Sequence, residues 1–157
     1  MKVIYPGSFD PPTMGHLAIV ERAASLFEEV IVVVANNPSK RYWLSDQERV
    51  ELFSTLVLPL KNVRVIADGG LVASLASRVG AAAIVKGLRS EADYRSEQVM
   101  AEANAVLGKG LESIFIMARG NLQGVSSSLV RQIHQLGGDV SSFVPEIVSD
   151  WLRRREK

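Results

Sequence analysis

The strongest indication of the fold is the run Val30-Ile31-Val32-Val33-Val34-Ala35. The run is apolar throughout, mostly β-branched, and too short to cross a membrane as a helix. An uninterrupted run of this kind is typical of a strand covered on both faces, as the strands of parallel sheets are. The segments around it therefore have to supply helices that cover those faces.

Helical periodicity is found on both sides of this run. Residues 16–27 place Leu17, Val20, Ala24 and Phe27 on one helix face, and Ser45-Asp46-Gln47-Glu48 has the spacing of a capping box. The alternation predicts strands at residues 3–5, 30–35, 63–66, 82–85 and 114–117, and helices at residues 16–27, 45–56, 71–79, 91–107, 127–136 and from 145 onward. This order indicates one α/β domain, residues 1–157, on a parallel sheet with right-handed crossovers.

The composition restricts the class of protein. Of 157 residues, 47% are hydrophobic and 22% are charged, which is ordinary for a globular protein. A net charge of +1 argues against a broad nucleic-acid surface, because such a surface needs a concentrated basic face. The sequence has no cysteine, no apolar run long enough for a membrane helix and no signal-peptide pattern. We expect a cytoplasmic protein without nucleic-acid or membrane partners.

The loop from Gly7 to His16, between the first predicted strand and helix, is long for such a connection. His16 follows this loop in the first turn of the helix, where free backbone N–H groups and the helix dipole favour anions. His16 is therefore a candidate ligand of a phosphate oxygen. The alternative is a structural role, in which Thr13 caps the helix and His16 only packs.

Three further loops at the same sheet edge carry cations or hydroxyl groups. Lys86-Gly87-Leu88-Arg89 follows the fourth predicted strand, and the switch point of an open sheet should place it beside the first loop. Lys40 lies in the loop Asn36–Arg41, whose composition is also that of an ordinary surface loop. Ser126-Ser127-Ser128 begins a helix, and the sequence favours capping and phosphate binding about equally there.

Together these loops predict a polyphosphate site. The sequence has neither a P-loop nor the Gly-x-Gly-x-x-Gly turn of dinucleotide-binding proteins. No pair of nucleophile and base stands out either. A phosphate nucleophile is already ionised at neutral pH, so transfer between two phosphates needs positioning and charge stabilisation rather than a general base.

The loops also resemble a known family. Gly7-Ser8-Phe9-Asp10-Pro11 followed by Thr13-Met14-Gly15-His16 resembles the (T/H)xGH signature of the nucleotidyltransferase superfamily. With Lys86-Gly87-Leu88-Arg89, Ser126-Ser127-Ser128-Leu129-Val130 and Gly138-Asp139-Val140, the chain is similar to the bacterial-type phosphopantetheine adenylyltransferases, end to end and in motif order. The resemblance implies a Rossmann-like doubly wound five-stranded sheet of order 3-2-1-4-5 with helices on both faces.

The resemblance further implies an activity. Members transfer an adenylyl group reversibly from ATP to 4′-phosphopantetheine, which gives dephospho-coenzyme A and pyrophosphate in coenzyme A biosynthesis. They use Mg²⁺ with ATP and form homohexamers. No residue of this chain is expected to be a metal ligand.

The roles that the resemblance implies fall into three groups. The catalytic residues would be His16, which stabilises the transition state at the α-phosphate, with Lys40, Lys86 and Arg89. The ATP-binding residues would be Ser8, Phe9, His16, Gly87, Leu88, Arg89, Glu97, Leu122, Gln123, Gly124, Val125, Ser126, Ser127 and Ser128. The residues that bind the acceptor would be Ser8, Lys40, Val72 and Lys86.

Two segments depart from the family pattern. Tyr94-Arg95-Ser96-Glu97 replaces a usual aromatic-Glu-Tyr-Glu, and Leu122-Gln123-Gly124 replaces a stretch with an aromatic residue, a serine and a phenylalanine. Two alternative functions therefore stay open. One is a related transferase with another nucleotide or phosphate acceptor. The other is a nucleotide- or coenzyme A-binding module without turnover.

Overall fold

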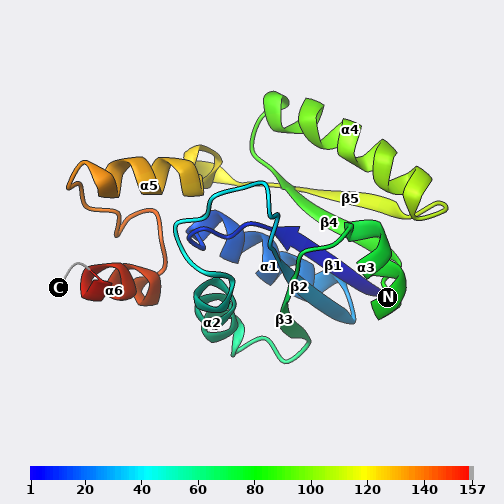
Figure 1. The fold of residues 1–157 in the computed structure, drawn as a ribbon, viewed down its shortest axis with the longest axis horizontal. Coiled ribbons are helices and arrows are strands. Elements are labelled where there is room, and N and C mark those ends of the chain that lie inside the picture. Colours follow the sequence, from blue (N-terminus) through cyan, green and yellow to red (C-terminus); the bar gives the residue numbers. More distant parts are fainter. Residues whose placement is uncertain (156–157) are drawn as a thin grey trace.

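The computed structural model describes residues 1–155. Its sheet has five parallel strands in the order β3-β2-β1-β4-β5 (Figure 1). The strands are β1 (Lys2–Gly7), β2 (Glu29–Ala35), β3 (Val63–Asp68), β4 (Ala83–Leu88) and β5 (Glu112–Met117). The helices are α1 (Met14–Leu26), α2 (Asp46–Val57), α3 (Val72–Val79), α4 (Glu91–Leu107), the 3₁₀ turn η1 (Gly120–Gly124), α5 (Ser127–Gln135) and α6 (Glu146–Arg155). The predicted fold class and strand order are confirmed.

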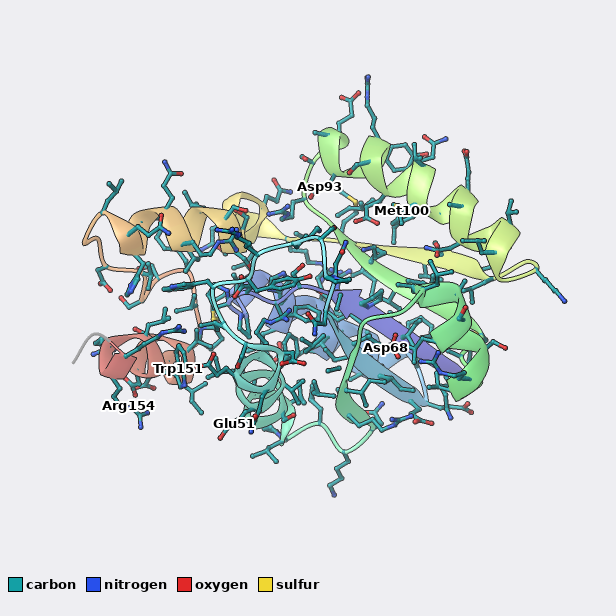
Figure 2. The ribbon with its side chains drawn as sticks, in the orientation of Figure 1. Glu51, Asp68, Asp93, Met100, Trp151 and Arg154 are labelled. Carbon is teal, nitrogen blue, oxygen red and sulfur yellow. The ribbon has the colours of Figure 1, made fainter. Side chains whose placement is uncertain are left out.

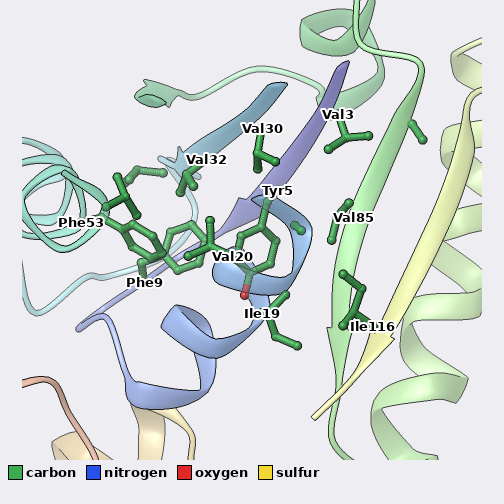
Figure 3. Packing of buried hydrophobic residues seen from close by; sticks show 14 residues of the cluster. Val3, Tyr5, Phe9, Ile19, Val20, Val30, Val32, Phe53, Val85 and Ile116 are labelled. Atoms are coloured by element: carbon green, nitrogen blue, oxygen red, sulfur yellow. The ribbon is translucent and has the colours of Figure 1, made fainter. Parts of the chain in front are cut away.

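Helices cover both faces of the sheet, as the run at 30–35 requires. Alternate side chains of the central strands, such as Tyr5 and Val32, pack with α1 and α2 (Figure 3). The intervening side chains, such as Ile4 and Ile31, pack with α3 on the opposite face. Because successive side chains of a strand point to opposite faces, two separate cores follow from one apolar run.

The pairing of β1 with its two neighbours differs in length. The β1–β2 ladder is continuous from Lys2 opposite Glu29 to Gly7 opposite Val34. The β1–β4 ladder comprises only Val3 opposite Ala83 and Ile4 opposite Ile84. Beyond Ile4 the two strands are no longer paired, although both continue toward their carboxyl ends. This is the point where strand order reverses, and ligands of open α/β sheets bind there.

The last two helices leave the sheet. In Figure 1, α5 and α6 lie at one end of the molecule, away from β5. A third apolar cluster joins Val130 of α5 and Leu152 of α6 to Leu52 of α2. The packing of α2 against α5 and α6 places the N-terminus of α5 next to the first loop.

Helix α4 differs from the others because it is exposed along most of its length. Asn104 is its one buried residue, and Val99, Val106 and Met100 are more than half exposed. Met100 is labelled on α4 in Figure 2. Within residues 1–155, no helix has both the length and the apolar character that a membrane crossing requires.

Several element boundaries differ from the sequence prediction, and two of the differences bear on the candidate site. Lys86-Gly87-Leu88 was expected in a loop, but these residues extend β4, where Lys86 is opposite Phe115 of β5. The apolar pattern ends at Val85, whereas backbone pairing with β5 continues for three more residues. Residues 120–124, for which the sequence predicts no helix or strand, form η1. Main-chain hydrogen bonds decide both boundaries, and side-chain patterns do not report them.

Candidate functional site

A pocket of about 280 Å³ lies at the carboxyl ends of β1 and β4, where their pairing has ended. We call it the switch-point pocket. Its walls come from β1, the loop after β1, the first turns of α1, the ends of β4 and β5, and the N-termini of α4 and α5. The lining residues are Tyr5, Pro6, Gly7, Phe9, Thr13, Gly15, His16, Ile19, Lys86, Gly87, Arg89, Asp93, Glu97, Ala118, Val125, Ser126, Ser127 and Ser128.

His16 is fixed by the N-terminal cap of α1. The Thr13 hydroxyl accepts a hydrogen bond from the His16 backbone N–H at 3.3 Å, and the Thr13 backbone N–H donates to His16 Nδ1 at 3.1 Å. Since Nδ1 accepts, the proton of the neutral ring is on Nε2. Burial, with a smaller contribution from the Arg89 charge, lowers the pKa of His16 to about 4. His16 is therefore a neutral hydrogen-bond donor at physiological pH.

The ring of His16 also rests on Phe9, with the ring centroids 5.0 Å apart and the planes nearly perpendicular. Phe9 is buried and has a φ of 49°, a left-handed conformation that a bulky side chain adopts only when its surroundings impose it. Gly7 permits this placement, because a Cβ there would lie 2.7 Å from the Phe9 ring.

Two charged side chains hold the loop on either side of Phe9. The fully buried Arg49 of α2 donates from Nη1 to the carbonyl oxygens of Ser8 at 2.7 Å and Ala35 at 2.9 Å. The buried Asp10 carboxylate accepts from the backbone N–H groups of Trp43 at 2.7 Å and Leu44 at 2.8 Å. The loops after β1 and β2 are thereby joined through charge-assisted hydrogen bonds, which are stronger than neutral ones.

The two cations of β4 and its loop are each paired with a carboxylate of α4. Lys86 Nζ lies 3.1 Å from Glu97 Oε1. Arg89 binds Asp93 through Nε at 2.9 Å and Nη2 at 3.2 Å, and its Nη1 donates to the Val125 carbonyl oxygen at 3.1 Å. Both cations line the pocket in fixed positions, and Arg89 also joins β4 to the segment before α5.

The three serines before and in α5 are all engaged. Ser126 caps α5 by accepting from the Leu129 backbone N–H at 3.1 Å. Ser127 donates to the Pro11 carbonyl oxygen at 2.7 Å, and Ser128 accepts from Arg131 at 3.3 Å. The predicted cap is confirmed. All three residues also line the pocket, so phosphate binding by them stays a prediction.

A neutral donor, two cations and two helix N-termini thus surround one pocket, and this arrangement suits a polyphosphate. The cytidylyltransferase-like family model matches residues 4–133, a segment that contains every wall of the pocket. Curated relatives match nearly the whole chain. The phosphopantetheine adenylyltransferase of Caldanaerobacter subterraneus subsp. tengcongensis is 46% identical, covering 98% of this chain and 96% of its own.

The chain belongs to the phosphopantetheine adenylyltransferase family. Two further members are similar over comparable lengths. That of Haemophilus influenzae strain 86-028NP is 44% identical, covering 98% of both chains, and that of Treponema pallidum strain Nichols is 44% identical, covering 99% of this chain and 98% of its own. A lipopolysaccharide core biosynthesis protein from Thermoplasma volcanium shares the fold, with a TM-score of 0.59 and 24% identity over 76% of this chain and 98% of its own.

The structure brings together most of the residues that the family resemblance assigns to ATP. Phe9, His16, Gly87, Arg89, Glu97, Val125 and the three serines of 126–128 all line the switch-point pocket. So does Lys86, which the resemblance assigns to catalysis and to the acceptor. In this adenylyltransferase, the turn with His16 and the strand end with Lys86 and Arg89 therefore face the same space.

Other assigned residues of the adenylyltransferase are not among those that line the pocket. Ser8 binds Arg49 through its carbonyl group, and Leu88 is buried on β4. Lys40 is exposed on the loop after β2, and Val72 begins α3 and packs with the core on that side of the sheet. The remaining assigned residues, Leu122, Gln123 and Gly124, form the end of η1 beside the pocket.

Sequence reasoning missed several residues of the site. Asp93 is four residues after Arg89 at a helix start, a spacing that predicts an ion pair, so the sequence contained a usable signal. Arg49 and Tyr5 left no such signal. Arg49 also donates to the Ser45 carbonyl oxygen one helical turn away, but its partners at the site, Ser8 and Ala35, are distant in sequence. Tyr5 has the pattern of an ordinary strand residue.

The acidic side chains of the pocket are the remaining candidates for metal ligands. Within residues 1–155, no three His, Cys, Asp or Glu side chains lie close enough together to hold a metal ion. Asp93 and Glu97 are carboxylates of the pocket, but Arg89 and Lys86 already bind them. The site therefore does not fit a metal ion that the protein holds by itself.

Proposed function

We propose that this protein transfers the adenylyl group of ATP reversibly to 4′-phosphopantetheine, giving dephospho-coenzyme A and pyrophosphate. The observation that carries the proposal is the meeting of His16, Lys86 and Arg89 in one pocket at the switch point. Relatives that are 41–46% identical over nearly the whole chain are phosphopantetheine adenylyltransferases, which supports the same substrates. The reaction would be a step of coenzyme A biosynthesis.

The proposed chemistry is an in-line displacement. A phosphate oxygen of 4′-phosphopantetheine attacks the α-phosphorus of ATP, the bond from that phosphorus to the α–β bridging oxygen breaks, and pyrophosphate leaves with the electron pair. The attacking phosphate is already ionised, so no side chain has to remove a proton. Catalysis then consists of positioning the reactants and stabilising the charge on the α-phosphate oxygens.

His16 and the cations of β4 divide this work. Neutral His16 donates from Nε2 to an α-phosphate oxygen, and the cap of α1 holds its ring in that tautomer. Lys86 neutralises charge where the two phosphates meet. Arg89 binds the leaving pyrophosphate together with the serines at the start of α5. Glu97 and Asp93 keep Lys86 and Arg89 oriented before ATP binds. The phosphate oxygens of ATP then compete with these carboxylates for the two cations.

The acceptor is proposed to enter from the side of the loop after β2. We assign Lys40 to the acceptor phosphate, Val72 to the pantetheine chain and Ser8 to the boundary between the acceptor and ATP. Lys40 is exposed, so its loop has to fold toward the pocket when the acceptor binds. Asn36 is held by the Asp68 carbonyl oxygen and Asn37 by the Tyr42 hydroxyl, so the movement would fall on the exposed residues 38–41.

Three broader features belong to the same proposal. Mg²⁺ would enter with ATP, carried on its phosphates. The protein would act in the cytoplasm and assemble as a homohexamer. The exposed Val99, Met100 and Val106 of α4 are apolar residues that an oligomer contact would cover. Light scattering coupled to size exclusion tests the assembly, which requires six chains per particle.

The direct test of the function is a product assay. The protein is incubated with ATP, 4′-phosphopantetheine and Mg²⁺, and dephospho-coenzyme A is measured by mass spectrometry while pyrophosphate is followed by a coupled assay. We expect both products in equal amounts. Product formation with CTP but not with ATP, or with another phosphate acceptor but not with 4′-phosphopantetheine, would instead indicate a related transferase.

A second arm separates catalysis from binding without turnover. Labelled pyrophosphate should be incorporated into ATP when dephospho-coenzyme A is supplied, because the reaction is reversible. Tight ATP or coenzyme A binding in a calorimeter without such exchange would identify a binding module. The retention of both cations and of His16 at one pocket favours the enzyme, because a binding module needs no groups directed at the α-phosphate.

A further inference from the structure

Tyr5 is a pocket residue with no role so far. It is the first residue of β1 beyond the pairing with β4, which ends at Ile4. Its side chain is 4% exposed and packs edge-on against Phe9, with ring centroids 5.3 Å apart (Figure 3). The ring thus belongs to the core, while the residue also lines the switch-point pocket.

The hydroxyl of Tyr5 has no partner within residues 1–155, where no group donates to it or accepts from it. Yet no fully buried side-chain nitrogen or oxygen of the described chain is without a hydrogen bond. The Tyr5 hydroxyl has no hydrogen bond and therefore cannot be fully buried, so its oxygen reaches solvent. The surface that Tyr5 lines is the switch-point pocket. A buried tyrosine normally satisfies its hydroxyl, so an unpartnered one in a pocket indicates a ligand.

The charges around the hydroxyl indicate what kind of ligand it meets. Burial raises the pKa of the Tyr5 hydroxyl above its ordinary value, the Arg89 charge opposes this effect, and the Glu97 charge adds to it. The group is therefore protonated at physiological pH. Glu97, the nearby acceptor, is already bound by Lys86 at 3.1 Å. A neutral O–H donor beside Lys86, Arg89 and His16 extends a set of groups that suits phosphate oxygens.

We propose that the Tyr5 hydroxyl is a further substrate-binding group, which donates a hydrogen bond to a phosphate oxygen of the bound nucleotide. The inference rests on the proposed function only in taking ATP as the ligand of the pocket. The contact joins the bound nucleotide directly to β1, the central strand of the sheet.

The test replaces one oxygen atom. Tyr5→Phe keeps the ring in the core, and Tyr42→Phe is the matched control, because the Tyr42 hydroxyl accepts from the Asn37 backbone N–H outside the pocket. Titration calorimetry with MgATP and with inorganic tripolyphosphate should show binding about tenfold weaker for Tyr5→Phe and unchanged for Tyr42→Phe. Wild-type affinity of Tyr5→Phe for both ligands overturns the proposal. So does a loss confined to ATP, since the contact would then be with the nucleoside.

A measurement on the unsubstituted protein covers the case in which Tyr5→Phe does not fold. The chain has three tyrosines, so with ¹³Cζ-labelled tyrosine, Tyr42→Phe and Tyr94→Phe assign the Tyr5 resonance by elimination. That resonance should shift on addition of tripolyphosphate with Mg²⁺ and stay in place on addition of adenosine. The absence of a shift with tripolyphosphate overturns the proposal. Because neither experiment needs an acceptor, failure to form dephospho-coenzyme A counts against the proposed function alone.

Discussion

The two sides of the switch-point pocket are built differently. The loop before α1 is buried from Phe9 to Thr13 and is held by Arg49, Trp43, Leu44 and Ser127. The segment 119–124, which leads to α5 on the opposite side, is largely exposed. Within residues 1–155 the hydrogen bonds of this segment are those of its own turn, and one hydrogen bond from Arg89 follows at Val125. The η1 turn also packs against α1.

The difference indicates a division of labour. A donor that must meet an α-phosphate oxygen in one geometry benefits from a rigid support, because displacement by a fraction of an ångström reduces transition-state stabilisation. A segment that closes over a nucleotide benefits from weak anchoring, since it has to open for product release. Substitutions in the first loop should therefore change catalysis or stability strongly, and substitutions in 119–124 should change them little.

The largest effect is expected from His16→Ala on the buried side. We expect kcat to fall by at least about 10²–10³-fold with little change in the KM for ATP, because the lost donor acts mainly in the transition state. Steady-state kinetics with His134→Ala as control measures this. His134 is the other histidine of the chain, and its ring packs against Trp43 at 5.0 Å, outside the pocket. A near-normal kcat for His16→Ala would show that the ring only supports the loop.

Arg49→Met tests the anchoring itself. The substitution leaves the carbonyl oxygens of Ser8 and Ala35 without their charged donor, and each loss is worth about 1–3 kcal/mol. We expect the free energy of unfolding to fall by about 3 kcal/mol in urea titrations. Arg64→Met, at a half-exposed ion pair with Glu29, should lower it by less than about 1 kcal/mol. Equal losses in the two variants would contradict the view that Arg49 secures the loop.

The lowered pKa of His16 makes the buried side sensitive to acid. The pKa of His16 is about 4 in the folded protein, against about 6.5 in an unfolded chain. Between these values the unfolded state binds the additional proton, so this contribution to stability falls as the pH falls from about 6.5 to about 4. Between pH 8 and pH 5 the loss from this residue should be about 2 kcal/mol.

Denaturant titrations at both pH values, on the wild type and His16→Gln, isolate this contribution. His16→Gln removes the titrating group and should lose that much less stability on acidification. If the two proteins lose equal stability, folding does not lower the pKa of His16, and the effect of burial assigned to the ring is wrong.

The smallest effect is expected on the exposed side. Gly120 has a φ of 58°, so Gly120→Ala strains the backbone and should lower the free energy of unfolding by about 1 kcal/mol. Gly124→Ala, where an added Cβ meets no atom within 4 Å, should change it by less than about 0.5 kcal/mol. Both variants should keep kcat within about threefold. A loss of kcat comparable to that of His16→Ala would remove the distinction between the two sides.

Much of the fold could be predicted because the relevant signals are local. The run at 30–35, the capping box at Ser45 and the turn glycine after α4 each act over a few residues, and each predicted its element within a few positions. The strand end at Lys86-Gly87-Leu88 could not be predicted in this way. Its pairing partners on β5 are about thirty residues away, and a lysine and a glycine give no strand pattern.

The site shows the same limit. The loop lengths and the cations at strand ends predicted a phosphate site, and sheet topology required the first and fourth loops to meet there. The carboxylates that hold Lys86 and Arg89, the burial of Arg49 and the free hydroxyl of Tyr5 were not predictable. Each depends on which side chain from a distant segment arrives within about 3 Å, the range of a hydrogen bond.

The family, the kind of chemistry and, through the family pattern, the strand order could all be inferred from the amino-acid sequence. Periodicity and motif spacing are properties of neighbouring residues, which a linear reading contains. The charge state of His16, the support that Arg49 gives to its loop and the position of Tyr5 at the switch-point pocket became known only from the folded structure. Charge state and hydrogen bonding depend on burial and on partners, and both are set by how the whole chain folds.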